Sequence, residues 1–412
     1  MHHQGNRWND ALLDSLRRQG DPLADEAFRI LIQDGEAGKA KQVFAEMDAN
    51  NEVPPETLFP ELHEFFSTTK RLPANVDLDR IRRGEDVFTR HPFTGALVLL
   101  AKSLPEGYAA PNLAIILNMS GDLRVHPYKR LLATLQTVVN VSTIRGFQDG
   151  GRAVITAQKL RLLHAGIRHI TRRYRPGFEP QYGVPANQED MLGTIMGFSY
   201  LVIEGMRTLQ VGLTESEEED FLYVWRVFAH MMGIHPPGKQ DSLEYLPENV
   251  AEAGRFYEAY RRRHYVDAEK NPDGVALAAA NLGMLTHFVP WPLRLFGLGA
   301  LPRLYMQELM GVEQCRRINI PSVRGDHLLW WILLHLHSLL RPFGNAGRSR
   351  HHHFGMTLFQ GMIKMEYGGD VTFTIPTTLG DLRKMVDANS HDSQKRTKNA
   401  VQHTVLAQRS HS

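Results

Sequence analysis

A histidine flanked by two arginines is the first feature of this sequence that could bind a cofactor. The stretch KLRLLHAGIRH, residues 159–169, contains Arg161, His164 and Arg168. On a helix, separations of three and four residues bring side chains onto one face. We interpret that face as cationic around a neutral imidazole. Such an arrangement suits a haem, whose iron takes an axial nitrogen and whose propionates accept hydrogen bonds from arginine.

The same spacing has a simpler interpretation. A buried His164 could bond to a backbone carbonyl, while Arg161 and Arg168 reach solvent or a helix end. Arginines that flank a histidine are common on helices. The spacing alone therefore leaves both interpretations open.

A second stretch, YKRLLATLQTVVNV (128–141), carries a further polar pair. Arg130 and Thr134 are four residues apart and share a helical face, with Ala133 beside them. A guanidinium and a hydroxyl next to a small residue could border the open side of a cofactor and orient dioxygen. A core helix whose arginine extends to the surface explains the pattern equally well.

The other histidines favour structural roles. His230 lies on an apolar helical face, which is typical of a buried core histidine. His169 follows His164 by five residues and should point away from the same iron. The run at 351–353 is interpreted as solvated surface.

Helices must position these residues, and helical periodicity dominates the sequence. The pattern predicts an all-α protein, with nearly continuous helix from about residue 77 to 265. Asn187 followed by Asp190 predicts a capped start for an apolar core helix over 191–209. Residues 370–376 could be extended.

Composition narrows the classes of function. The chain has 412 residues with 47 Lys and Arg against 45 Asp and Glu, a balance that argues against nucleic acid as a partner. The single cysteine, Cys315, excludes an internal disulfide framework and covalent attachment of a c-type haem. The N-terminal stretch lacks the apolar region of a secretory signal, which predicts an intracellular, cytoplasmic protein.

Two apolar segments, 287–306 and 327–344, raise the question of a membrane. The first contains prolines and arginines, and the second contains three histidines and is shorter than the roughly 20 residues that a spanning helix needs. We expect neither to cross a bilayer, and peripheral membrane contact remains open. The sequence does not indicate an oligomeric state.

Four ordered motifs together resemble a known family. HPYKRLLATLQTVVNV, KLRLLHAGIRH, GVPANQEDMLGTIMGFSYLVIEGMRTL and YVWRVFAHMMGI are similar to motifs of the latex clearing proteins, or rubber oxygenases. The domain of that family also occurs in the endoplasmic-reticulum oxygenase of mycophenolic acid biosynthesis. The resemblance covers roughly residues 80–310.

The resemblance implies an all-helical, globin-like fold around one haem b, and an oxygenase that cleaves a carbon–carbon double bond of a polyisoprenoid with dioxygen. By its motif, His164 matches the proximal ligand of the haem iron. Arg168 matches the arginine one turn along that helix, while Arg130 and Thr134 match the arginine and threonine on the distal side.

Two positions depart from the family pattern. Ala133 stands where the rubber oxygenases carry a lysine able to occupy the distal iron position. We therefore expect a distal side that is open or filled by water. The family's general-base glutamate also has no obvious match, because Asp122 is the only carboxylate between Tyr108 and Arg130.

These observations suggest a domain plan and a function. We expect an N-terminal helical extension over 1–75, a haem-binding oxygenase domain over 76–312, a C-terminal extension over 313–388 that packs on the core, and a disordered tail over 389–412. The hypothesis is a haem b-dependent oxygenase with an apolar, unsaturated, isoprenoid- or lipid-like substrate, either a small molecule or a polymer. The alternatives are a non-catalytic haem protein that senses or carries a gas or haem, and a helical scaffold without a cofactor.

Overall fold

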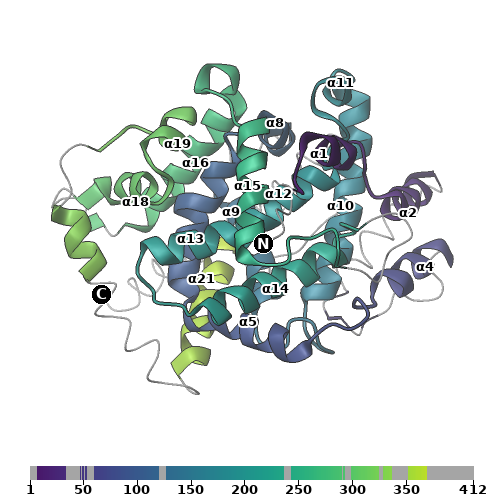
Figure 1. Cartoon of the computed structure of the whole chain (residues 1–412), viewed down its shortest axis with the longest axis horizontal. Helices are drawn as coiled ribbons and strands as arrows, with labels where there is room; N and C mark the ends of the chain where they lie inside the picture. The colour runs from purple at the N-terminus through teal and green to yellow at the C-terminus, as the bar shows by residue number, and fades with distance from the viewer. Residues whose placement is uncertain are drawn as a thin grey trace, which may run out of the picture.

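The structure is a computed structural model that describes residues 7–33, 47, 49–50, 52, 60–119, 127–235, 243–289, 291–292, 298–323, 328–335 and 351–368. Within these residues every regular element is a helix (Figure 1), so the prediction of an all-α protein is confirmed. The globin-like arrangement of the helices stays a prediction. The segment 370–376 and the tail 389–412 lie outside the described residues, as do the side chains of residues 351–353.

Short helices form the N-terminal part, as expected: α1 (Asp10–Arg17), α2 (Pro22–Gln33) and α4 (Pro60–Thr69). Asn9 caps α1 by accepting a hydrogen bond from the Leu12 amide at 3.0 Å. Helices α2 and α4 lie along the outer side of α10 (Figure 1) and form a small separate core with it. The N-terminal helices therefore cover the back of the helix that carries His164.

The central part is a bundle of α5 (Leu78–Arg90), α6 (Pro92–Val98), a π-helical turn (Leu99–Ser103), α7 (Leu104–Gly107), α8 (Pro111–Met119), α9 (Pro127–Ser142), α10 (Ala153–Tyr174), α11 (Phe178–Tyr182), α12 (Gln188–Phe198), α13 (Tyr200–Thr208), α14 (Glu215–Met231), α15 (Val250–His264), η2 (Ala268–Lys270) and α16 (Pro272–Phe288). Helices α5 and α14 pack along each other. A Cβ atom on Gly84 would lie 2.1 Å from the carbonyl oxygen of Asp220, so only glycine permits this approach.

Local sequence signals explain where the central helices begin. Thr214 and Glu217 form a reciprocal capping box at the start of α14. Asn187 caps α12 by accepting a hydrogen bond from the Asp190 amide at 2.9 Å, which confirms the predicted start. The apolar stretch that follows is buried, as expected, but it forms two helices instead of one, because the backbone breaks at the buried Ser199.

The C-terminal part packs on this bundle. It contains η3 (Leu298–Ala300), α18 (Leu301–Met310), α19 (Val312–Arg317), a short helix over 328–335 and α21 (His351–Tyr367). Helix α21 packs against α9 and α5. In the part of the chain that the structure describes, no helix combines the length and apolarity needed to cross a membrane.

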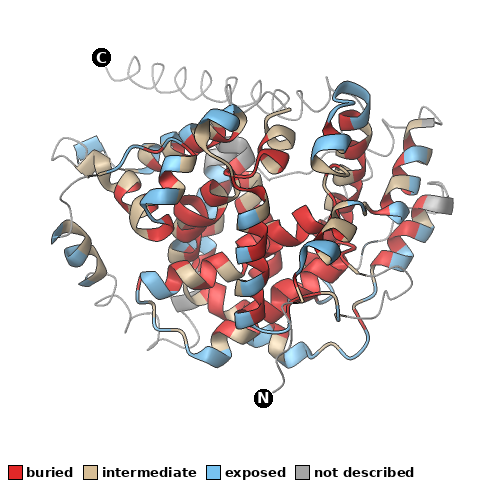
Figure 2. Cartoon of the chain, turned by 45° about the horizontal axis from the view of Figure 1, so that its top comes forward, coloured by how far each residue is buried: buried red, intermediate tan, exposed pale blue. Residues whose placement is uncertain are grey.

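Burial is highest in the central helices, as Figure 2 shows. Helices α10, α12 and α14 bury residues on most of their surfaces. His230 is buried near the end of α14, as its apolar surroundings predict. Such a scaffold can hold side chains rigidly, which a cofactor site requires.

Candidate cofactor site

A stripe in the middle of α10 is covered less completely than the residues beside it. Leu160, Leu163, His164 and Ile167 are only partly buried, whereas residues 153–159 are buried and the helix becomes exposed only in its last turn, at 172–174. Their spacing places them on one face. The stripe is apolar apart from the imidazole, so it is the wall that a flat apolar group would need.

His164 is a neutral imidazole in this environment. Burial, followed by the positive charge of Arg168, lowers the pKa of His164 to about 4, while Asp21 opposes the shift. Its Nδ1 atom is buried and forms no hydrogen bond within the described part of the chain. A neutral imidazole carries a proton on only one of its two ring nitrogens. The other nitrogen has a free lone pair and can coordinate a metal.

Arg161 is held by the N-terminal part. Its Nε and Nη2 atoms donate to the two carboxylate oxygens of Asp21 at 2.6 and 2.9 Å, and Nη1 reaches the carbonyl of Met231 at a longer 3.4 Å. Burial acts to raise the pKa of Asp21, but the Arg161 guanidinium outweighs it and holds that pKa below its usual value. Gly233 lets the end of α14 approach, since a Cβ there would lie 3.1 Å from Arg161 Cζ.

Arg168 is fully buried and only partly bonded. Its Nε atom donates to Asp25 at 2.6 Å and Nη1 to the carbonyl of Ala186 at 3.3 Å. The Nη2 atom is buried and has no hydrogen-bond partner in the part of the chain that the structure describes. An unpartnered guanidinium nitrogen is costly to bury, so this donor is available to an anionic group.

The carboxylates change the electrostatics that α10 alone suggests. Asp21 and Asp25 form ion pairs with Arg161 and Arg168, so the two arginines have carboxylate partners that the sequence of α10 does not reveal. Sequence reasoning did not identify these acids. The only available signal was an acidic pair one turn apart at the start of α2.

The second predicted polar pair lies on α9, which packs against α10. Ala133 and Thr134 are half-buried there. The backbone of Arg130 belongs to the first turns of α9, while its side chain lies outside the described residues. The fold therefore places the two motif-bearing helices beside each other.

His169 faces a different environment. Its ring packs near that of Phe28, with centroids 5.8 Å apart, and it lines a surface pocket of about 560 Å³ between α2 and α10. Ile32 and Arg172 also line this pocket, and His164 does not. This placement agrees with the expectation that His169 does not share the ligand position of His164.

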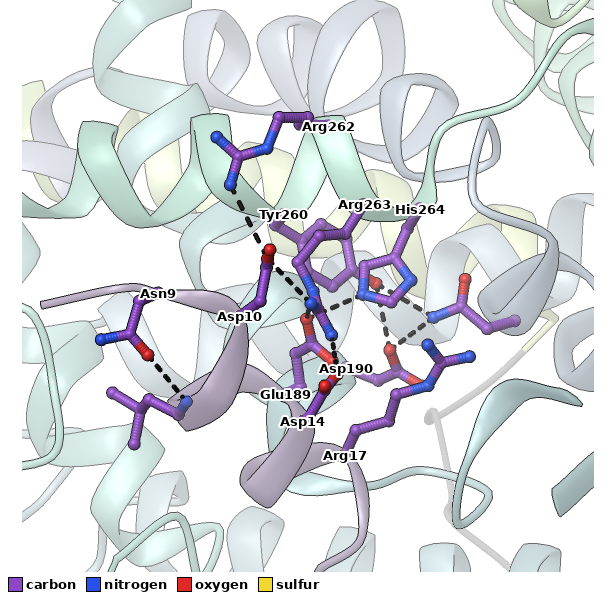
Figure 3. Close-up of polar contacts among 12 residues, drawn as sticks. Asn9, Asp10, Asp14, Arg17, Glu189, Asp190, Tyr260, Arg262, Arg263 and His264 are labelled. Carbon is purple, nitrogen blue, oxygen red and sulfur yellow. Dashed lines mark hydrogen bonds and ion pairs between the residues drawn. The ribbon is translucent and has the colours of Figure 1, made fainter. Parts of the chain in front are cut away.

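A second enclosed histidine lies where α15 ends, in the junction drawn in Figure 3. His264 Nε2 and Arg263 Nε both contact Glu189 Oε1, at 2.8 and 2.9 Å. Arg263 also donates to Asp14 at 2.6 Å and to Asp10 at 3.0 Å on α1. Sequence reasoning did not identify this junction, whose only signal was the basic run RRRH that ends α15.

Asp190 forms the inner layer of this junction. It accepts hydrogen bonds from Asn112 on α8, from Asn187 at 2.9 Å and from the Tyr260 hydroxyl at 3.3 Å. These donors favour the carboxylate, yet burial dominates and raises the pKa of Asp190 to about 6. The junction thus joins α1, α8, α12 and α15 through polar groups in the interior.

Glu106 lies just outside the interval in which a general base was sought. It is fully buried, with an ion pair to Arg261 and one to Lys102 at 3.3 Å. Lys102 also donates to the carbonyl of Leu309 at 2.9 Å. Because Glu106 forms ion pairs with both of these cations, we interpret it as a structural carboxylate and not as the general base. Asp122 lies outside the described residues.

Three comparisons with known proteins all relate this chain to rubber oxygenases. Residues 90–339 match the sequence model of the catalytic domain described as "ER-bound oxygenase mpaB/B'/Rubber oxygenase". A rubber oxygenase of Streptomyces sp. (strain K30) is 24% identical over 273 residues, which are 64% of this chain and 63% of that protein. The chain thus aligns with slightly less than two thirds of that relative. The latex clearing protein LCP in its closed state has a similar fold, with a TM-score of 0.65, 19% identity and 90% of both chains covered.

Proposed function

This chain belongs to the family of ER-bound oxygenases and rubber oxygenases, and from that premise we propose a haem b-dependent oxygenase that acts with dioxygen on an apolar, unsaturated substrate. The substrate class is isoprenoid- or lipid-like. The observation that carries the proposal is the half-covered apolar stripe of α10 with the neutral His164 in it. When bound, haem b supplies the iron that activates dioxygen.

The residues of α10 fit a haem. His164 would bind the haem iron through Nε2, because Nδ1 is buried. Arg168 would hold a propionate through Nη2, which has no hydrogen-bond partner among the described residues. Arg161 would contribute through Nη1, whose contact with the Met231 carbonyl is long at 3.4 Å, since Nε and Nη2 donate to Asp21.

The residues of α9, which packs against α10, would also line the cofactor site. Thr134 contributes a hydroxyl from a half-buried position, and Ala133 contributes only a methyl group. We propose Arg130 and Thr134 as the catalytic pair, which orients dioxygen and stabilises developing negative charge. A fixed donor of this kind contributes roughly 3–4 kcal/mol where it has been measured in other enzymes.

The first experiment is a visible absorption spectrum of protein produced with sufficient iron. A Soret band that survives desalting supports haem, and its absence contradicts the proposal. Oxygen uptake with an unsaturated isoprenoid then separates an enzyme from a haem carrier. Cleavage of the double bond leaves one oxygen atom on each of its two carbons, so two carbonyl groups appear for each dioxygen consumed.

Two substitutions separate catalysis from cofactor retention. We expect Arg130→Ala to keep most of its haem and lose most of its oxygen uptake per haem. Arg168→Ala should do the reverse, because Arg168 shares α10 with His164 and its Nη2 has no hydrogen-bond partner among the described residues. Arg172→Ala, on the exposed side of the same helix, is the matched control and should change neither. Normal uptake per haem in Arg130→Ala would remove Arg130 from the catalytic pair.

A further inference from the structure

The helix over 328–335, which we call the outer helix, exposes apolar side chains to solvent. Its sequence, LLWWILLH, contains no charged residue. None of its residues is buried, and Figures 1 and 2 show it at the edge of the molecule next to α18. A surface helix normally turns polar residues outward. The outer helix therefore has an apolar face with no partner in the described structure.

One side of the outer helix is attached to the protein. Trp330 packs edge-on against Tyr305 of α18, with ring centroids 5.7 Å apart. Leu328, Trp331 and Ile332 occupy the opposite side and are exposed, Leu328 at 69% and Trp331 at 55%. Their spacing of three and four residues makes this one continuous stripe. The attachment presents the stripe outward.

The tryptophans of the chain divide into two groups. Trp8 and Trp225 are fully buried in the main core. Trp291, Trp330 and Trp331 instead belong to the C-terminal surface, and Trp291 is 71% exposed just beyond the end of α16, which packs against α18. Indole rings favour the boundary between hydrocarbon and water, because the ring is apolar while its N–H needs a polar partner.

Charge distinguishes among the possible partners. Residues 291–350 contain eight arginines and no lysine, against three acidic residues, whereas the whole chain is nearly balanced with 47 basic and 45 acidic residues. A second copy of the chain would bring two basic regions together, and a neutral hydrocarbon surface would make no use of the charge. An anionic lipid surface complements both the arginines and the tryptophans.

We propose that the exposed stripe of the outer helix, Leu328, Trp331 and Ile332, docks the protein on the interface of an anionic lipid bilayer. No helix among the described residues is long and apolar enough to cross a membrane, so the stripe would lie in the interface. This proposal is independent of haem binding, because no residue of α9 or α10 takes part in it.

The test is co-sedimentation of the full chain with vesicles. Phosphatidylcholine vesicles with about a third phosphatidylserine should bind the protein, and binding should weaken as salt rises from about 0.05 to 0.5 M. The double variant Trp331→Glu with Ile332→Glu should lower the partition coefficient about tenfold or more. Trp331→Phe should retain most of the binding, because it keeps an aromatic group.

Leu78→Glu is the matched control, because Leu78 of α5 is also 55% exposed and lies outside the C-terminal part. It should bind vesicles like the wild type. Failure of the wild type to bind, or unchanged binding of the double variant, would overturn the proposal. So would a dimer in sedimentation analysis that the double variant dissociates while vesicles bind neither protein, since the stripe would then contact a second copy.

Discussion

Two histidines, the partly buried His164 of α10 and the buried His264 of α15, have different surroundings. His264 contacts Glu189 at 2.8 Å, in a junction that also contains Arg263 and the acids of α1. Within the described residues His164 Nδ1 forms no hydrogen bond, and burial lowers the pKa of His164 to about 4. His264 thus has a side-chain partner, whereas His164 Nδ1 has none among the residues that the structure describes.

The difference indicates which ring is available to a ligand. A buried polar group without a hydrogen bond costs stability, and native proteins seldom retain one without a reason. The environment of His264 supplies a partner and joins helices. The environment of His164 supplies an apolar wall. Four residues along the same helix, Arg168 Nη2 has no hydrogen-bond partner among the described residues. We interpret the first as structural and the second as a ligand position.

The largest expected effect is the loss of haem in His164→Ala. Without the imidazole the iron has no strong donor on that face of α10, and haem per protein should fall more than about tenfold. His264→Ala should keep its haem, because His264 is committed to Glu189. Absorption spectra with protein quantification measure both. Equal haem content in the two variants would abolish the distinction between the two rings.

Next in size is the cost of breaking the junction. Glu189→Ala leaves Arg263 and His264 without their buried carboxylate, so the free energy of unfolding should fall by about 3–5 kcal/mol. Glu179→Ala is the control, since its ion pair with Arg172 lies at the surface and should be worth less than about 1 kcal/mol. Urea denaturation of the haem-free proteins compares them. A small loss in Glu189→Ala would show that the junction is not structural.

A smaller effect should appear in the pH dependence of His164. Its folded pKa of about 4 lies below the usual value of 6.5, so the folded state disfavours protonation and stability is lost as pH falls through this interval. Relative to His164→Leu, haem-free wild type should lose about 2 kcal/mol of unfolding free energy between about pH 7 and 5. Parallel pH curves for the two proteins would mean that the ring is not desolvated.

Asp190 should show the opposite sign and the smallest effect. Its folded pKa of about 6 lies above the usual 3.8, so the folded state favours the protonated acid and stability is lost as pH rises through this interval. Relative to Asp190→Asn, the wild type should lose about 1 kcal/mol between about pH 5 and 7. A gain over that range would indicate that the hydrogen bonds from Asn112 and Asn187 outweigh burial.

Sequence signals that act within one turn of helix explain which parts of the fold could be predicted. The 3.6-residue period, the Asn187 cap and the capping box at Thr214 act within one turn of helix, so the all-α fold and the start of α12 could be predicted. The motifs around His164 and Thr134 lie within single helices and could be identified in the same way. Their roles at a haem stay predictions.

The tertiary structure alone decided which groups meet. Asp21 lies 140 residues from Arg161 along the chain, and Glu189 lies 75 residues from His264. Periodicity and caps carry no information about such pairs, because a side chain's distant partner depends on the path of the whole backbone. For the same reason, only the folded chain shows that the His164 stripe of α10 is partly uncovered. Only the folded chain shows, too, that the outer helix exposes Trp331.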